Sequence, residues 1–248
     1  MSGTILTPAE LNPLRIGLGP LEMDAWLAPR PGDAALLAER GRLAAEQPDA
    51  VLAALSEGEA AVTELAAILR GRGHAIPGAD ARGALAAMAG AVAEDLLLLT
   101  PAGDTYRLVA GVLCFPNRWR LTEKIGKGLA AIHTPVPEYE TALASPVDRF
   151  LARLRPGRAY TRSNWGLASS PALHLPLPVA PVDPVRDSAF FLRREEQGFV
   201  KLPASEAVVF SIRTTVTPWA EIPAEHQAAI REVAGLLSPA WRDYKSLK

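Results

Sequence analysis

The segment from residue 95 to residue 139 reads DLLLLTPAGDTYRLVAGVLCFPNRWRLTEKIGKGLAAIHTPVPEY, and it contains the change of pattern that decides the fold class. Two apolar runs, Asp95–Thr100 and Tyr106–Phe115, flank a Pro-Ala-Gly-Asp turn, which is typical of a β-hairpin. Apolar residues then recur at helical spacing from Leu121 to Ile132. The segment therefore predicts a pair of strands that leads into helices.

The chain after this segment returns to strands. A helix is expected over Pro146–Leu154, and a last amphipathic helix over Ala224–Leu237. Between them lie three strand candidates: Tyr160–Leu167, Phe190–Leu202 and Ala207–Val216. Strands followed by helices and then by strands predict an α+β fold, in which helices are inserted into an antiparallel sheet. This is also the order of a PAS-type domain, whose helices and sheet face enclose a small-molecule pocket.

The first 93 residues have a different character. Residues 1–31 carry five prolines and Trp26, which predicts an extended arm with a short turn around Leu21–Leu27. Helices are expected next over Asp33–Gln47, with Asp33 as the N-cap, from Pro48 onward, over Glu59–Arg70 and over Ala81–Glu94. We predict one compact unit, with an arm and helices (1–93), a PAS-like core (94–218) and a C-terminal helix (219–248).

Composition excludes several classes of protein. The net charge of −1 gives no long-range attraction to nucleic acid. The single cysteine, Cys114, excludes an internal disulfide and any site that needs several cysteines. No apolar run approaches the roughly 20 residues of a membrane span, and the N-terminus does not resemble a secretory signal. We therefore expect a cytoplasmic protein with no nucleic-acid or membrane partner.

His133 is the candidate metal ligand. It ends a helical run, and the prolines at 135 and 137 stiffen the chain that follows, so its backbone is held on a rigid frame. A capping or core role is the common alternative for such a histidine. Gly126 and Gly128 weaken the preceding helix, which indicates close approach either of a flat group or of a strand. Cys114 is a second possible ligand, although a cysteine within an apolar strand is usually a small buried hydrophobe.

Basic side chains precede His133. They are Arg118, Arg120, Lys124 and Lys127, which lie at irregular spacing next to Trp119. They form either a solvated surface or a set of partners for anionic groups such as propionates, which guanidinium groups bind in a fork.

Two strand candidates carry polar residues on one face. Arg162 and Asn164 point to one side of a strand and Trp165 to the other. On the next strand, Glu195 and Gln197 share a face with Arg193. Such residues belong to a ligand site or to cross-strand ion pairs, and Arg213 is expected to pair with Glu195.

Six stretches of the chain together resemble a known family, the alpha subunit of the heme-dependent oxidative N-demethylases. They are PLRIGLGPLEMDAWL, EDLLLL, FPNRWRLTEKIGKGLAAIHTPVPEY, RSNW, LRREEQGFVKLP and VVFSIRT, and they span residues 13–216. The chain departs from the family pattern at Asn117, Gly198 and Lys201, and the change at Gly198 is expected to alter the pocket.

The resemblance implies a PAS-like fold that binds heme b and uses oxygen as a monooxygenase. It implies removal of a methyl group from a small methylated amine as formaldehyde, with electrons from a separate reductase subunit that holds flavin and iron–sulfur centres. It also implies His133 as the proximal ligand to the heme iron. Expected cofactor-binding residues are Arg118, Lys124, Lys127, Arg162, Asn164 and Trp165, and the expected catalytic residues are Glu195 and Gln197.

Two other functions remain open at this point. A heme- or ligand-binding PAS-type module could sense or carry rather than catalyse. A structural subunit without heme would use His133 only as a helix cap. The absorption spectrum of the purified protein separates a structural subunit without heme from a heme-binding demethylase, sensor or carrier.

Overall fold

A computed structural model describes residues 17–78 and 80–248. Its centre is a seven-stranded sheet in the order β1-β5-β6-β7-β3-β4-β2, and every neighbouring pair is antiparallel. The strands are β1 (Gly19–Leu21), β2 (Leu52–Ala54), β3 (Asp95–Ala102), β4 (Thr105–Val112), β5 (Ala159–Ala168), β6 (Phe191–Lys201) and β7 (Val208–Pro218). The predicted α+β fold with an antiparallel sheet is confirmed.

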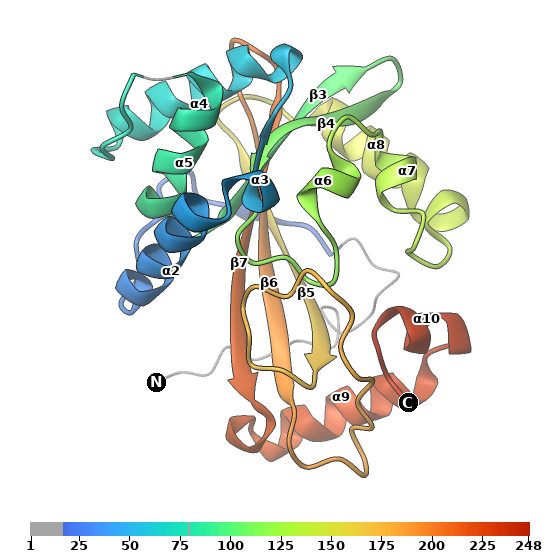
Figure 1. Ribbon diagram of the computed structural model, residues 1–248. Coiled ribbons are helices and arrows are strands. Elements are labelled where there is room, and N and C mark those ends of the chain that lie inside the picture. The colour runs from blue at the N-terminus through green and yellow to red at the C-terminus, as the bar shows by residue number, and fades with distance from the viewer. Residues whose placement is uncertain (1–16, 79) are drawn as a thin grey trace.

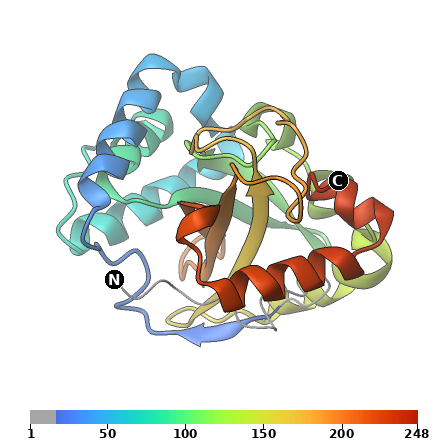
Figure 2. The same ribbon diagram turned by 90° about the horizontal axis from the view of Figure 1, so that it is seen from below.

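Helices cover both faces of this sheet. They are α2 (Asp33–Glu46), α3 (Pro48–Val51), α4 (Glu59–Gly71), α5 (Ala81–Ala91), α6 (Leu121–Lys124), α7 (Leu129–Ile132), α8 (Ala144–Arg153), α9 (Ala224–Leu236) and α10 (Pro239–Tyr244). Helices α2, α4 and α5 gather on one side, and α6 to α8 on the other (Figure 1). Helix α9 crosses one end of β5, β6 and β7, as the view from below shows (Figure 2). Among the described residues, no helix is both long and apolar enough to cross a membrane.

The four consecutive leucines of β3 explain why both faces are covered. Alternate residues of a strand point to opposite faces. Leu96 and Leu98 pack into the core beneath α2, α4 and α5, whereas Leu97 and Leu99 pack into the core that includes residues of α6, α7 and α8. A run that is apolar on both sides is what a strand buried between two layers requires.

Most predicted elements are present, and the predicted hairpin is the β3–β4 pair. The helix expected from Pro48 is only a single turn, α3, after which Leu52–Ala54 forms β2 against β4. Ala and Leu have weak strand preference, so the tertiary pairing overrides the local pattern there. Sequence reasoning also missed α10.

The helix predicted over Leu121–Ile132 is interrupted between α6 and α7. The backbone N–H of Gly126 donates to the carbonyl of Leu108 on β4 (2.7 Å), and the N–H of Leu108 donates to the carbonyl of Lys127 (3.1 Å). Gly126 has φ of +78°, a left-handed conformation that favours glycine. A Cβ at Gly126 would meet only Leu55 Cδ1, at 3.5 Å, so the left-handed turn rather than a lack of room explains this glycine.

The N-terminal arm is anchored by Trp26. β1 pairs with β5, and the indole Nε1–H of the buried Trp26 donates to Ser211 Oγ (3.1 Å). A Cβ at Gly198 would lie 2.5 Å from that Oγ and 3.3 Å from Trp26 Cδ1. Gly198 thus makes room for the anchor on the face opposite Glu195. The expectation that this residue alters the pocket stays a prediction. Arm residues 1–16 lie outside the described residues.

Arg213 pairs with two carboxylates, one at the start of α2 and one just before β3. It reaches Asp33 at 2.6 Å and Glu94 at 2.8 Å, and all three residues are buried. The expected pairing with Glu195 is wrong because Arg213 lies opposite Glu196 in the β6–β7 register and so faces the other side of the sheet. Asp33 is also not the N-cap of α2, since that position is Gly32. The ion pairs fasten α2 to β7.

Replacement of Arg213 by methionine should therefore destabilise the fold strongly. It leaves two buried carboxylates without their cation, which costs about 3–5 kcal/mol of unfolding free energy. Urea unfolding followed by circular dichroism measures this loss. The matched control is Arg42→Met, which removes an exposed arginine from between Glu39 and Glu46 and should leave the urea midpoint nearly unchanged. Equal midpoints for both variants would refute a stabilising role for Arg213.

Candidate functional site

Strands β5 and β6 place five polar side chains on one face of the sheet. In the register, Arg162 lies opposite Gln197, Asn164 opposite Glu195, and Gly166 opposite Arg193. We call Arg162, Asn164, Arg193, Glu195 and Gln197 the polar face. It lies on the same side of the sheet as α8, because Tyr160 and Phe199, one row further along, pack edge-on against Phe150 of that helix.

Glu195 is the centre of the polar face. The side-chain amide of Asn164 donates to its carboxylate at 3.2 Å, and that of Gln197 donates at 2.9 Å. Glu195 is buried, with 9% of its surface exposed. Two amide donors on neighbouring positions hold the carboxylate in one orientation, which suits a residue that must meet a ligand.

Arg193 has a structural role. Its guanidinium donates to the carbonyls of Phe115, Pro116, Ala172 and Leu173 at 2.7–3.1 Å. These carbonyls belong to the start of the segment before α6 and to the proline-rich loop between β5 and β6. Arg193 therefore holds both segments against the end of the polar face.

Arg162 has free donor capacity. Its Nε is buried and has no hydrogen-bond partner within the described ranges. Burial lowers the pKa of Arg162, while the nearby charge of Glu195 and the hydroxyl of Tyr244 oppose that shift. A buried guanidinium with an unused N–H is costly unless a ligand accepts from it.

The C-terminal turn, residues 244–247, forms the edge of the same cluster. Lys245 Nζ donates to the carbonyl of Trp165 at 2.7 Å and lies 4.6 Å from the centre of its indole ring. Burial lowers the pKa of Lys245 to about 7, and Glu195 opposes this shift. Sequence reasoning missed this turn because α10 is a helix of only six residues, too short for a periodic signal. The basic and aromatic residues of WRDYKSLK were the signal that was available.

Arg118 joins the turn to the polar face. Its guanidinium donates to Ser246 Oγ, and its backbone N–H donates to the carbonyl of Leu175 at 2.6 Å. Its φ of +63° is unusual for a residue with a side chain and costs energy that the surrounding contacts must supply. Burial lowers the pKa of Arg118, against the effects of Tyr244 and Glu195.

His133 is the C-cap of α7, and its ring is oriented from both sides. The imidazole stacks on Tyr139 with a centroid separation of 4.2 Å and an interplanar angle of 11°. Nδ1 lies 2.9 Å from the carbonyl oxygen of Leu129. A carbonyl only accepts, so Nδ1 carries the proton and Nε2 keeps its lone pair. Burial lowers the pKa of His133, and the charges of Lys124 and Arg162 lower it further, which favours the neutral imidazole.

The remaining predicted residues have different positions. Lys124 Nζ donates to the carbonyl of Ile132 at 2.5 Å and so caps α7, whereas Lys127 is exposed. Trp165 faces the other side of β5 and packs in a cluster with Trp219 of the segment before α9. The structure thus brings together the predicted residues of β5 and β6 with Arg118, and it leaves Lys127 and Trp165 apart from them.

Cys114 does not have the surroundings of a metal-binding thiolate. It is fully buried, and burial raises the pKa of its thiol to about 12. Its backbone N–H donates to the carboxylate of Asp95 at 2.7 Å, which is a structural contact. Within residues 17–78 and 80–248, no group of three or more His, Cys, Asp and Glu residues could hold a metal ion.

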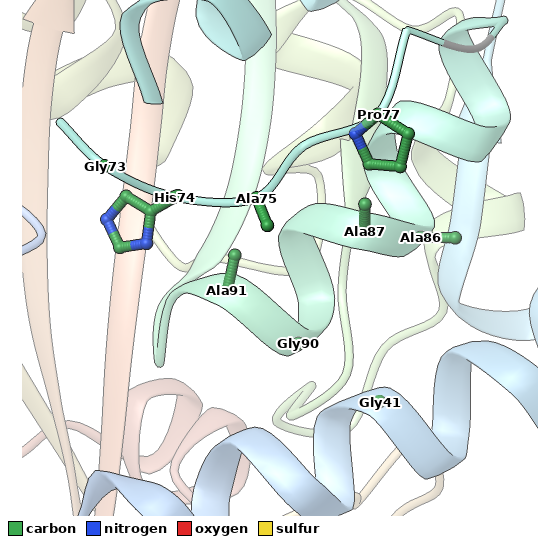
Figure 3. A pocket seen from close by; sticks show the side chains of 9 residues that line it. All are labelled: Gly41, Gly73, His74, Ala75, Pro77, Ala86, Ala87, Gly90 and Ala91. Atoms are coloured by element: carbon green, nitrogen blue, oxygen red, sulfur yellow. The ribbon is translucent and has the colours of Figure 1, made fainter. Parts of the chain in front are cut away.

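A surface hollow of about 490 Å³ lies far from these residues in the fold, between α2, α5 and the loop that follows α4 (Figure 3). Alanines and glycines line most of it, and His74 is its only ionisable side chain among the described residues. With so few polar groups the hollow offers little chemistry, and the polar face with His133 remains the better candidate site.

The buried amine of Lys245 should make stability depend on pH. Its folded pKa of about 7 is below the ordinary value near 10.4, so the unfolded chain binds more protons between these two pH values. Stability therefore rises with pH in this window. Relative to Lys245→Met, the wild-type unfolding free energy should increase by about 1 kcal/mol per pH unit between pH 7.5 and 9.5. Urea unfolding across that range measures it, with Lys248→Met as a control for loss of a nearby exposed lysine. Parallel wild-type and Lys245→Met profiles would contradict the burial argument.

Comparison with known proteins adds the family. No curated protein sequence matches the chain. A family model described as "Haem-dependent oxidative N-demethylase, alpha subunit-like" matches residues 68–248, well over half of the chain and the whole of the site described above. The resemblance seen in the motifs is confirmed, and the chain belongs to the family of proteins that are like the alpha subunit of the heme-dependent oxidative N-demethylase.

Proposed function

We propose that this protein binds heme b through His133 and acts as an oxygen-using oxidative N-demethylase on a small methylated amine. The observation that carries the proposal is the orientation of His133, whose Nδ1–H is taken up by the Leu129 carbonyl (2.9 Å). A histidine that ligates a metal commonly donates its other ring N–H to such an acceptor, which fixes the tautomer. Membership of the family supports the choice of heme.

The donor set of the site fits this cofactor. Heme needs only one or two protein ligands because the porphyrin supplies four nitrogens, so a single neutral histidine is sufficient. Its two propionates need cationic donors, and the buried Nε of Arg162 has no partner within the described part of the chain. Arg162 and Lys124 both lie close enough to lower the pKa of His133. We assign His133 to the iron and Arg162 to a propionate, with sheet and helices α6 to α8 as a PAS-like enclosure.

When bound, the heme supplies the activation of molecular oxygen. The chain itself supplies a place for the amine. Glu195 presents a buried carboxylate whose orientation is set by Asn164 and Gln197. A protonated methylamine is attracted to this charge in a site of low dielectric, and its methyl group is thereby held in a fixed position. Glu195 is the amine-binding residue in this proposal, and Gln197 orients it.

The reducing equivalents come from another protein. Conversion of a methylamine, one O2, two protons and two electrons gives the demethylated amine, formaldehyde and water. A chain with one cysteine, itself buried, cannot hold an iron–sulfur cluster by its thiolates. The proposal therefore includes a separate flavin and iron–sulfur reductase.

Removal of the imidazole tests the heme assignment. Wild-type protein mixed with hemin should give a sharp Soret band, and His133→Ala should lose or strongly shift it. His133→Gly should regain the wild-type spectrum with added imidazole, which shows that loss of the band is not misfolding. His226→Ala is the control, because this half-buried histidine lies on α9 in a different part of the fold. An unchanged spectrum in His133→Ala would remove this histidine from the site.

Neutralisation of Glu195 tests the amine site. With a reductase supplied, Glu195→Gln should lower kcat/KM for formaldehyde release about 10- to 100-fold, because a hydrogen bond to a charged group is worth about 1.5–3 kcal/mol. The Soret band should stay unchanged. Glu196→Gln is the matched control on the opposite face of β6, where the native residue pairs with Arg30 and Arg194. A stable oxygen complex in the wild type without any formaldehyde would instead favour a sensor or carrier.

A further inference from the structure

We propose that the substrate carries a carboxylate in addition to its methylated amine, and that Arg118 with Lys245 binds this carboxylate. The substrate class is then an N-methyl amino acid rather than a simple alkylamine. The inference rests on the proposed function for the identity of the amine site at Glu195.

The first argument is the balance of charge. The carboxylate of Glu195 favours the charged form of all three cations, Arg118, Arg162 and Lys245. None of these three cations forms a salt bridge with a carboxylate in residues 17–78 and 80–248. Lys245 is buried and Arg118 and Arg162 are half-buried, and cations withdrawn from water in excess of their counter-charges are costly unless an anion joins them. The cluster is therefore short of negative charge.

The second argument is the order of the cations along the sheet. The Arg162–Gln197 row is next to the Tyr160–Phe199 row that packs under α8. The Asn164–Glu195 row comes next, about 7 Å further along the strands. The Gly166–Arg193 row follows after the same interval. Glu195 thus lies between an end that faces α8 and an end that faces the C-terminal turn.

Arg118 and Lys245 belong to the second end. A Cβ on Gly166 would come within 4.0 Å of the side-chain nitrogen of Asn117, the neighbour of Arg118. Lys245 is held by the carbonyl of Trp165, in the same part of β5. Arg162, by contrast, is at the first end, and it is one of the two cations that lower the pKa of His133. We therefore assign the heme propionate to Arg162, which leaves Arg118 and Lys245 available to bind a second anion.

The third argument is that this second end is built from parts that are distant in the sequence. Arg118 has a left-handed backbone, and Ser246 of the turn accepts from its guanidinium. The turn itself is fixed by a hydrogen bond from the N–H of Val182 to the carbonyl of Ser246 (2.8 Å). A strained residue held by contacts more than a hundred positions away is typical of a ligand site.

An amino acid with an N-methyl group matches both ends of this arrangement. Its ammonium meets Glu195, and its carboxylate meets the forked donors of Arg118. The chemistry is unchanged: the N–CH3 group leaves as formaldehyde, O2 provides its oxygen and forms water with two protons, and the separate reductase provides two electrons. The product is the amino acid without its methyl group.

Calorimetry on the heme-loaded, ferric full chain tests the inference without any turnover. Sarcosine (N-methylglycine) should bind at least 10-fold more tightly than dimethylamine. Arg118→Gln should abolish this preference by weakening sarcosine at least 10-fold, while dimethylamine binding and the Soret band stay the same. Lys245→Met should weaken sarcosine in the same selective way. Arg120→Gln is the matched control, since Arg120 is exposed and lies two residues away.

Each other outcome has a definite meaning. Equal affinity for the two ligands in the wild type overturns the inference, and so does a loss of heme from Arg118→Gln, which would make Arg118 a propionate partner. If Arg118→Gln fails to fold, Lys245→Met and the wild-type preference decide. If sarcosine binds in the Arg118-dependent manner but no formaldehyde forms with a reductase, the ligand class stands and the proposed oxidation fails.

Discussion

The register between β5 and β6 is the constraint on which the site depends. Antiparallel pairing sets Asn164 opposite Glu195 and Arg162 opposite Gln197, so two amides donate to one buried carboxylate and a guanidinium lies in the next row. If β5 slipped by one residue against β6, Arg162 and Asn164 would point into the apolar core on the other side of the sheet, and Trp165 would point to the polar side. The register is fixed by the length of the pairing, ten residue pairs, and by apolar contacts on both sides.

The two faces of β6 and β7 divide stability from function. On one face, Arg213 meets Asp33 and Glu94 in ion pairs that tie α2 and the start of β3 to β7. On the other face, Glu195 accepts from two neutral amide donors, and Arg118, Arg162 and Lys245 form no salt bridge within the described residues. An arginine that is ion-paired with carboxylates serves a structural network, whereas cations without a carboxylate partner leave room for an anionic ligand. The same strands therefore carry a structural network on one face and a candidate ligand site on the other.

Much of this could be predicted from residue patterns. The order of strands and helices along the chain and the α+β class follow from local periodicity. So does the alternation that places Glu195 and its neighbour Glu196 on opposite faces of β6. Three features could not be predicted. The interruption before α7 depends on hydrogen bonds to Leu108 on β4, and the partner of Arg213 depends on how α2 folds back over the sheet. The C-terminal turn has its role only because Arg118 and Trp165 come to meet it. Contacts of this kind are properties of tertiary structure and leave no periodic signal.

The close packing around Gly198 also has an evolutionary consequence. A side chain at this position would meet Ser211 Oγ at 2.5 Å and the indole of Trp26 at 3.3 Å, so the glycine and the tryptophan depend on each other. A larger residue at position 198 could be accommodated only if the indole of Trp26 or the hydroxyl of Ser211 moved. The two positions should therefore covary, although they lie more than 170 residues apart in sequence. Covariation between the two positions would show that a larger side chain on the sheet is accompanied by a smaller one in the arm.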